Sequence, residues 1–158
     1  MTQTVGTTLL SGTALLAGTA LLAAAILAPG WPVSAQAGKT FAARLSPVPI
    51  DVAMQATVSG SGAVTAVLSG ATLSIAGTFE GLRSPATIAR VHTGPKGIRG
   101  PVAFDLVVTK ATGGSLSGRV DLTPPQRADL ENGRLYVQLH SEKAPDGNLW
   151  GWLLPEKH

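Results

Sequence analysis

Two histidines lie in segments that predict β-strands, and they are the residues of this sequence best suited to chemistry. His92 ends the segment 87–92, and His140 ends the segment 134–140. Imidazole is a common ligand of copper and zinc, so histidines on two adjacent strands could supply half of a metal site. A third ligand would have to come from elsewhere, and no spacing selects one among Asp105, Glu142, Asp146 and His158. The alternative is that both histidines make ordinary hydrogen bonds at strand ends.

Other polar side chains are expected on the same strand faces as the two histidines. Successive side chains of a strand point to opposite faces, so Arg90 shares a face with His92. On the second strand, Tyr136 and Gln138 share a face with His140, opposite a face of leucine and valine. The leucine and valine face must be the core. The sequence therefore predicts a polar cleft outside the core that contains Arg90, Tyr136 and Gln138.

The last predicted strand carries two tryptophans. Asn148, Trp150 and Trp152 share one face of it, and Leu149 and Leu153 share the other. If the leucines face the core, the three other side chains form an exposed surface for a protein, a glycan or a membrane, because tryptophan is enriched at binding hot spots and membrane interfaces. Two alternatives are that a loop covers this face, or that the tryptophans are core and the leucines are exposed.

No catalytic constellation is found in the sequence. Ser141 adjoins His140, but neighbours on a strand point to opposite faces and cannot form a nucleophile–base pair. The glycine-rich segment 94–100 does not lead into a helix, which argues against a phosphate-binding loop. There are no cysteines, so thiolate metal sites are excluded as well. We expect a protein that is not an enzyme.

Short apolar segments separated by turn residues recur along the chain after residue 37. In the segment 71–79, Leu73, Ile75 and Phe79 share one face, and serine and threonine share the other. Alternation of period two is typical of a strand with one buried face. About eight or nine such segments predict an all-β fold, an antiparallel Greek-key-like β-sandwich.

One segment predicts a short helix. Thr123 is a suitable N-cap, Pro124 fits the first helical position, and Gly133 fits the end. We expect this helix to carry the chain across one end of the sandwich.

The first 37 residues differ from the rest because they contain no Asp, Glu, Lys or Arg. An apolar run over 9–28 is followed by Ala35-Gln36-Ala37, which has the small residues that a signal peptidase requires. We expect a signal peptide over 1–37 and a domain over 38–158 that is exported to the periplasm or the exterior. The alternative is an uncleaved membrane anchor. The net charge of +3 comes from scattered basic residues, which argues against nucleic-acid binding.

Several of these segments together resemble the CHRD (chordin-type) domain. The resemblance covers most of the chain from Phe41 to Leu154, and it is carried by the order and spacing of the segments 79–82, 86–87, 89–94, 100–102, 122–123, 130–133, 136–141 and 145–151. It implies an exported β-sandwich domain. The histidine-bearing strand of the family is similar to the copper strand of Cu/Zn superoxide dismutases, which is an analogy of fold and not of function.

The chain departs from the family pattern at three places. Arg90 replaces the first histidine of the usual Ala-His-Ile-His, and a permanently charged guanidinium is a poor metal ligand. Gln138 replaces an asparagine, and Trp150 and Trp152 replace polar residues. We therefore expect a non-enzymatic binding or accessory domain that docks a partner through its tryptophan strand, with no cofactor. The alternative is a copper-binding or superoxide-dismutase-like redox protein that uses His92 and His140.

Overall fold

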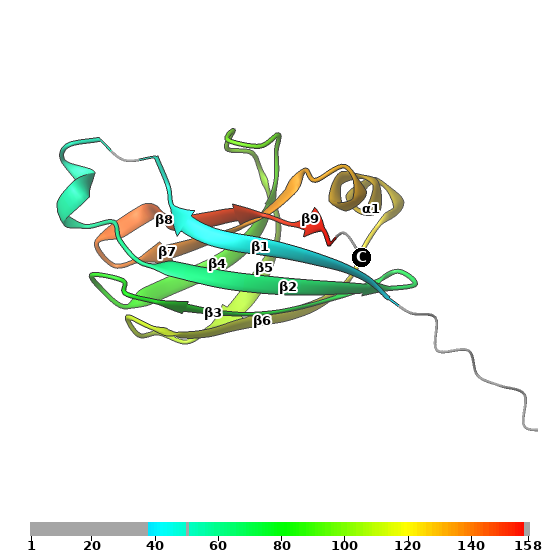
Figure 1. The fold of residues 1–158 in the computed structure, drawn as a ribbon, viewed down its shortest axis with the longest axis horizontal. Helices are drawn as coiled ribbons and strands as arrows, with labels where there is room; N and C mark the ends of the chain where they lie inside the picture. The colour runs from blue at the N-terminus through cyan, green and yellow to red at the C-terminus, as the bar shows by residue number, and fades with distance from the viewer. Residues whose placement is uncertain (1–37, 50, 157–158) are drawn as a thin grey trace, which may run out of the picture. The chain divides into compact units, whose positions relative to one another are not determined.

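The computed structural model describes residues 38–49 and 51–156, shown in Figure 1. The predicted leader and the candidate ligand His158 lie outside this range. The described part contains nine strands, one α-helix and one short 3-10 helix: β1 (Lys39–Pro47), η1 (Met54–Ala56), β2 (Ser61–Ser69), β3 (Thr72–Glu80), β4 (Ala86–Thr93), β5 (Val102–Val108), β6 (Gly114–Asp121), α1 (Pro124–Glu131), β7 (Leu135–Ser141), β8 (Ala144–Trp152) and β9 (Leu154–Pro155). The predicted all-β fold with one short helix is confirmed.

The strands form a closed antiparallel barrel of eight strands, and β9 is added to it beside β1. The order around the barrel is β2-β3-β6-β5-β4-β7-β8-β1, and β1 closes the ring by pairing with β2. Two strands, β1 and β5, each pair with two neighbouring strands that a sandwich would place in separate sheets. β1 pairs with β2 over Lys39–Leu45 and then with β8 at Ser46 and Pro47. β5 pairs with β4 and then with β6 at Val107 and Val108.

The predicted sandwich is therefore wrong in its arrangement of strands. Alternation along a strand shows that one face is buried, and this holds equally for a sandwich and for a barrel. The difference lies in whether two strands continue from one half of the sheet into the other. That property depends on pairing between distant segments, which the alternation pattern does not contain.

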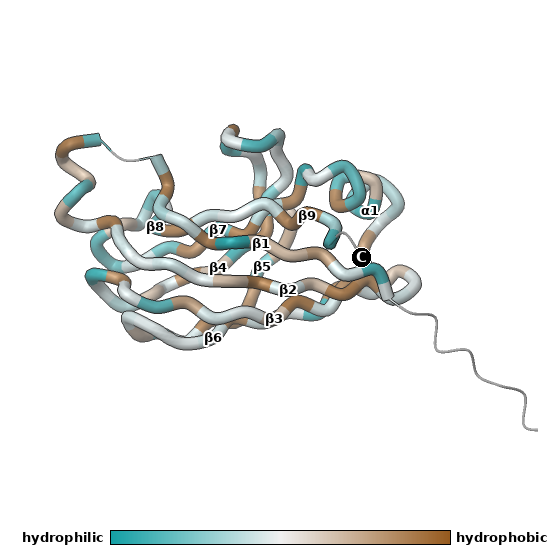
Figure 2. Tube along the Cα trace, viewed as in Figure 1, coloured by the Kyte–Doolittle hydropathy of each residue, from teal (hydrophilic) through white to brown (hydrophobic). Residues whose placement is uncertain are grey.

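The barrel interior is filled by the apolar side chains that the alternation selects. On β2, for example, Val64, Ala66 and Leu68 are buried, and the residues between them are exposed or half-buried. Figure 2 shows the same change of hydropathy along the strands. This interior core includes four residues that are sequence neighbours of the predicted site residues: Val91, Val137, Leu139 and Leu149. Their neighbours in sequence therefore face outward.

The predicted helix is confirmed as α1, which lies at one end of the barrel beside β9 (Figure 1). The Thr123 hydroxyl accepts a hydrogen bond from the Gln126 backbone N–H, and the Gln126 side chain accepts one from the Thr123 N–H. This reciprocal pair satisfies two donors that a helix start otherwise leaves free. Gly133 follows with a φ of 65°, which suits the turn after a helix. No helix of the described residues is long and apolar enough to cross a membrane.

A second, smaller core lies outside the barrel, on the outer face of β7 and β8. We call it the outer core. Its buried members are Val48, Val58, Tyr136, Ala144, Trp150 and Trp152, and Met54 packs against it. Val48, Met54 and Val58 belong to the connection between β1 and β2, which covers this face of the sheet. The outer core is the base on which the candidate site is built.

Candidate functional site

The register of β4, β7 and β8 brings the predicted polar residues together on one outer face. His92 pairs with Tyr136, and Arg90 pairs with Gln138. Tyr136 and Gln138 in turn pair with the two tryptophans of β8. The predicted cleft residues and the tryptophans therefore form one continuous surface, as strand alternation indicated. The structure shows that most of this surface is covered, which the sequence did not predict.

A row of aromatic rings crosses the face from His92 to Trp152. The rings of His92 and Tyr136 stack with centroids 5.1 Å apart, and those of Tyr136 and Trp152 stack at 4.7 Å. Trp150 meets Trp152 edge-on at 4.7 Å. Such pairs add about 0.5–1.5 kcal/mol each beyond their buried area. The row therefore fixes the position of the His92 ring from one side.

The loop between β4 and β5 closes over His92, and the side chains of His92, Tyr136 and Trp152 each form a hydrogen bond to it. His92 Nδ1 donates to the Gly100 carbonyl oxygen at 3.0 Å, and the Gly100 N–H donates to the Tyr136 hydroxyl at 3.0 Å. Trp152 Nε1 donates to the Gly94 carbonyl at 3.0 Å. A side chain at Gly100 would collide with the Thr93 carbonyl, so this close approach requires glycine. We call residues 94–100 the upper loop.

The start of β8 closes over His140 in a similar way. His140 Nδ1 donates to the Pro145 carbonyl at 2.8 Å. The Asp146 carbonyl accepts from Gln138 Nε2 at 2.9 Å and from Arg99 Nη1 of the upper loop at 2.7 Å. The second of these bonds joins the two covering segments.

Gly147 allows the start of β8 to lie close to the Gln138 side chain. Its φ of 126° is one that side chains disfavour, and an added Cβ would meet the Gln138 amide. Glycine at this position therefore lets β8 lie directly on Gln138.

These bonds fix the proton positions of both imidazoles. A carbonyl oxygen only accepts, so each Nδ1 must carry the proton that it donates. In the neutral ring, Nε2 then has a free lone pair. Both Nε2 atoms are buried, and neither has a hydrogen-bond partner among the described residues. The two ring centroids lie 6.5 Å apart, with an angle of 33° between the planes. The site thus holds two neighbouring, buried and unused nitrogen acceptors, which we call the histidine pair.

The surroundings disfavour the charged form of His140. Burial lowers the pKa of His140, and electrostatic repulsion from neighbouring groups, Arg90 and Arg99 among them, lowers it further, while the Pro145 carbonyl acts in the opposite direction. Burial disfavours a charged imidazolium because the interior solvates it poorly. The neutral ring is the form in which Nε2 can accept a proton donor or bind a metal ion.

Among the described residues, none of the other candidate metal ligands joins the histidine pair. Asp105 accepts a 2.7 Å hydrogen bond from Arg90 in an ion pair, and Asp146 contributes its backbone carbonyl. Within residues 38–49 and 51–156, no group of three His, Cys, Asp or Glu side chains could hold a metal ion. Glu142 thus does not form such a group, and His158 is not described. Two nitrogen donors are what the described site offers.

The tryptophans occupy the predicted face of β8, but the expectation that they are exposed is wrong. Each is only 8 % exposed, because the connection between β1 and β2 packs against them. Of the alternatives, the one with a loop over this face is correct. Asn148 is fully buried, donates to the Ser141 hydroxyl at 2.9 Å and accepts from the Ser59 N–H at 3.2 Å. Its contacts are internal.

The part of the tryptophans that remains accessible faces a hollow of about 380 Å³. Trp150 and Trp152 line it together with Arg44 of β1 and Lys96 of the upper loop. Neither cation belongs to an ion pair of the described residues. The hollow thus combines two tryptophan side chains with two positive charges, and Lys96 and Arg44 are site residues that the sequence did not indicate.

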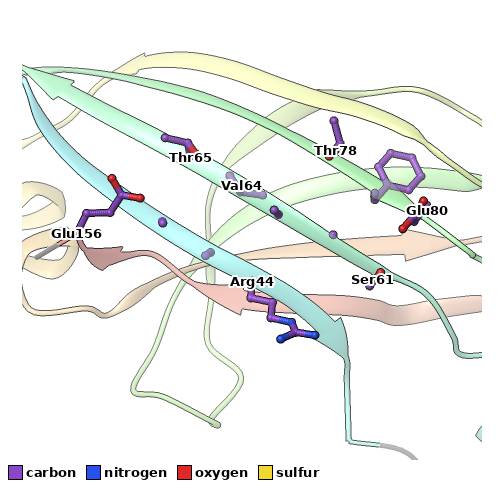
Figure 3. A pocket seen from close by; sticks show the side chains of 12 residues that line it. Arg44, Ser61, Val64, Thr65, Thr78, Glu80 and Glu156 are labelled. Carbon is purple, nitrogen blue, oxygen red and sulfur yellow. The ribbon is translucent and has the colours of Figure 1, made fainter.

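A second hollow, of about 700 Å³, lies on the outer face of β1, β2 and β3 and is shown in Figure 3. It is shallow, and much of its floor is alanine, glycine, serine and threonine. Its two carboxylates, Glu80 and Glu156, lie toward opposite sides of it (Figure 3). It contains none of the predicted site residues and no paired acid–base groups, so its size alone does not indicate a site.

Sequence patterns could find the two histidines but not the groups that orient them. Those groups are backbone carbonyls of Gly100 and Pro145. The only signals for them are the glycine-rich segment 94–100 and the segment Pro145-Asp146-Gly147, which indicate turns without showing where the turns fold.

Comparison with known proteins gives one finding. The family model of the CHRD domain matches residues 41–153, which include the barrel interior, the outer core and the histidine pair. No curated protein and no solved structure matches the chain.

Proposed function

This chain belongs to the CHRD domain family, whose model covers residues 41–153, and from this premise we propose that it is an exported, non-enzymatic binding domain. Membership in this family suggests a small binding domain of the extracellular type. The ligand site that we propose is the hollow beside the tryptophan strand, and the ligand is an acidic glycan.

The observation that carries this proposal is the presence of two tryptophans and two cations in one hollow. Trp150 and Trp152 line the hollow with Arg44 and Lys96, and neither cation has an acidic partner in the described part of the chain. Tryptophan offers a rigid apolar surface, and its cost in conformational entropy on binding is small. Positive charges at the rim attract an anion and orient it. The tryptophans thus take part through the small part of each side chain that remains exposed, while the buried part holds the outer core together.

Tryptophan fluorescence tests the proposal. In the chain from Gly38 onward, Trp150 and Trp152 are the only tryptophans, so the signal reports on this hollow. We expect a saturable change with polygalacturonate and none with neutral dextran. The double variant Arg44→Gln with Lys96→Gln should lose the change. The matched variant Lys110→Gln with Arg119→Gln, which removes two cations outside the hollow, should keep it. Equal loss in both variants would reduce the effect to general charge attraction and contradict a specific site.

A second candidate function is metal binding by His92 and His140. The specific observation in its favour is the pair of buried Nε2 atoms without partners. Buried polar atoms are normally satisfied, so these two nitrogens are suited to bind an ion or a water molecule. In metal sites, a ligating histidine usually donates its other ring nitrogen to a carbonyl or carboxylate, as both do here. Copper is the candidate ion.

Metal analysis of protein purified from its native compartment tests this second candidate. We expect copper near one equivalent in the natural chain and none in the variant His92→Ala with His140→Ala. A metal-free natural chain that also fails to take up copper in solution would contradict the proposal.

A further inference from the structure

We propose that the histidine pair binds one cuprous ion, Cu(I), through the Nε2 atoms of His92 and His140 as its two ligands. The inference rests on the metal-binding candidate and adds the oxidation state and the coordination number. Three features of the site support it: the arrangement of the donors, the local charge and the number of ligands.

The donors are prepared before a metal arrives. Each Nδ1 donates to a backbone carbonyl, at 3.0 Å for His92 and 2.8 Å for His140, which directs the lone pair to Nε2. The ring centroids are 6.5 Å apart. One ion between two imidazoles needs a similar separation, because each metal–nitrogen bond is about 2.0 Å and the two half-rings supply the rest. The separation of the ring centroids is therefore compatible with one ion between the two rings.

The local charge favours a monovalent ion over a divalent one. Arg90 and Arg99 are close enough for their positive charges to act on His140. The carboxylate of Asp105 pairs with Arg90 and offsets part of its charge, while Arg99 has no acidic partner among the described residues. Repulsion from the two guanidinium groups is proportional to the charge of the ion, and a divalent ion is therefore penalised about twice as strongly.

The number of donors leads to the same ion. The described residues bring no third His, Cys, Asp or Glu side chain to the pair. Zinc in proteins is bound with four ligands, and cupric copper prefers a tetragonal set. A closed-shell monovalent ion such as Cu(I) has no geometric preference from its d-electrons and is stable between two nitrogen donors in line. Burial of both Nε2 atoms also limits the access of water that would complete a larger coordination shell.

The test is an anaerobic competition titration of the full chain with Cu(I) against the chelator bicinchoninate. Parallel titrations use Zn(II) and Cu(II), and X-ray absorption is measured on the Cu(I) complex. We expect one equivalent of Cu(I) with two nitrogen neighbours and no saturable Zn(II) at the same concentration. His92→Gln and His140→Gln should each lower the Cu(I) affinity by at least about 100-fold, more than loss of an outer hydrogen-bond partner costs.

Two further variants keep the result interpretable if the histidine variants unfold. His158→Gln should leave the Cu(I) affinity unchanged, because two ligands suffice. Arg90→Gln should raise the Cu(I) affinity by about tenfold or more, since it removes a nearby positive charge. Circular dichroism spectra establish that each variant is folded.

The outcomes separate the inference from the function on which it rests. Binding of Zn(II) or Cu(II) as tightly as Cu(I), or loss of Cu(I) in His158→Gln, would overturn the two-ligand cuprous site and leave metal binding intact. Absence of binding for every ion, with water as the occupant of the site, would overturn both.

Discussion

The two imidazoles of the histidine pair are alike in how they are held, although they come from different strands. In each, a backbone carbonyl takes the proton of Nδ1 and leaves Nε2 buried and unused. The sequence predicted the strand faces of His92 and His140 correctly because side-chain direction follows from a period of two. It could not predict the tautomer, which depends on carbonyl groups from the upper loop and from the start of β8.

At the same scale, we expect Arg90 to select the ions that the pair accepts. Arg90→His replaces the guanidinium with a third imidazole on the same face of β4, one alternation step from His92. We expect Zn(II) and Cu(II) to bind to this variant, since it gains a ligand and loses a repelling charge. Isothermal titration of the variant and the natural chain measures the difference. Unchanged affinity for Zn(II) would show that position 90 does not face the pair.

The charge state of His140 predicts how acid affects the metal-free protein. Folding lowers the pKa of His140 below its ordinary value of 6.5, chiefly through burial, with His92, Arg90 and Arg99 adding to the effect. Below that value the unfolded chain binds more protons than the folded one, so stability falls as the pH decreases toward the lowered pKa.

Thermal unfolding in the presence of a chelator, at about pH 7 and about pH 5, measures this loss. His140→Gln should reduce the dependence of Tm on pH over this window, and His158→Gln should not. Identical pH profiles for the natural chain and His140→Gln would contradict a folded-state effect on this ring.

At the scale of elements, β8 shows where reasoning from sequence stops. Alternation correctly placed Trp150 and Trp152 opposite Leu149, which lies in the barrel interior. It could not show that Val48 and Val58, about a hundred residues away in the chain, cover the rings. Burial by a distant connection leaves no mark on the local pattern. The same limit applies to Asn148, whose partners Ser141 and Ser59 lie on other segments.

The outer core predicts that the tryptophans are needed for folding. The double change Trp150→Ser with Trp152→Gln should lower the free energy of unfolding strongly, since replacing one buried tryptophan with a small residue costs about 3–5 kcal/mol. Urea denaturation followed by circular dichroism measures it. An unchanged free energy of unfolding would mean that these rings form an exposed patch after all.

Trp152 also holds the upper loop, and a milder variant separates this role from packing. Trp152→Phe keeps most of the aromatic volume and loses the hydrogen bond to the Gly94 carbonyl. We expect a loss of about 1 kcal/mol and faster amide exchange in residues 94–100. Hydrogen exchange followed by mass spectrometry is the measurement. Exchange that increases equally throughout the barrel would indicate global destabilisation and not release of the loop.

At the scale of the whole molecule, the barrel positions the site through its two joining strands. β5 continues from β4 toward β6, and β1 continues from β2 toward β8, so the outer face that carries the site is part of one closed sheet. Strand number and the helix α1 followed from the sequence because they depend on local patterns. The closure of the barrel did not follow from the sequence, because it depends on which strand ends pair with each other.

Export is a prediction for the whole chain, and it concerns residues outside the described part. The first 37 residues carry no Asp, Glu, Lys or Arg and end in Ala-Gln-Ala, so we expect the mature protein to begin at Gly38. Intact mass spectrometry of the exported protein gives the answer directly. Retention of Met1 in a membrane fraction would favour an anchor instead.

In the site that we propose, His92 and His140 present two free Nε2 atoms to one monovalent ion. Nitrogen-15 NMR of the imidazole rings measures this directly, with Ag(I) as an air-stable substitute for Cu(I). We predict the Nδ1–H tautomer for both rings in the metal-free protein. One equivalent of Ag(I) should then shift both Nε2 signals together and couple each of them to silver. Protonated Nε2 atoms in the metal-free protein, or Nε2 signals that Ag(I) leaves unchanged, would contradict the account.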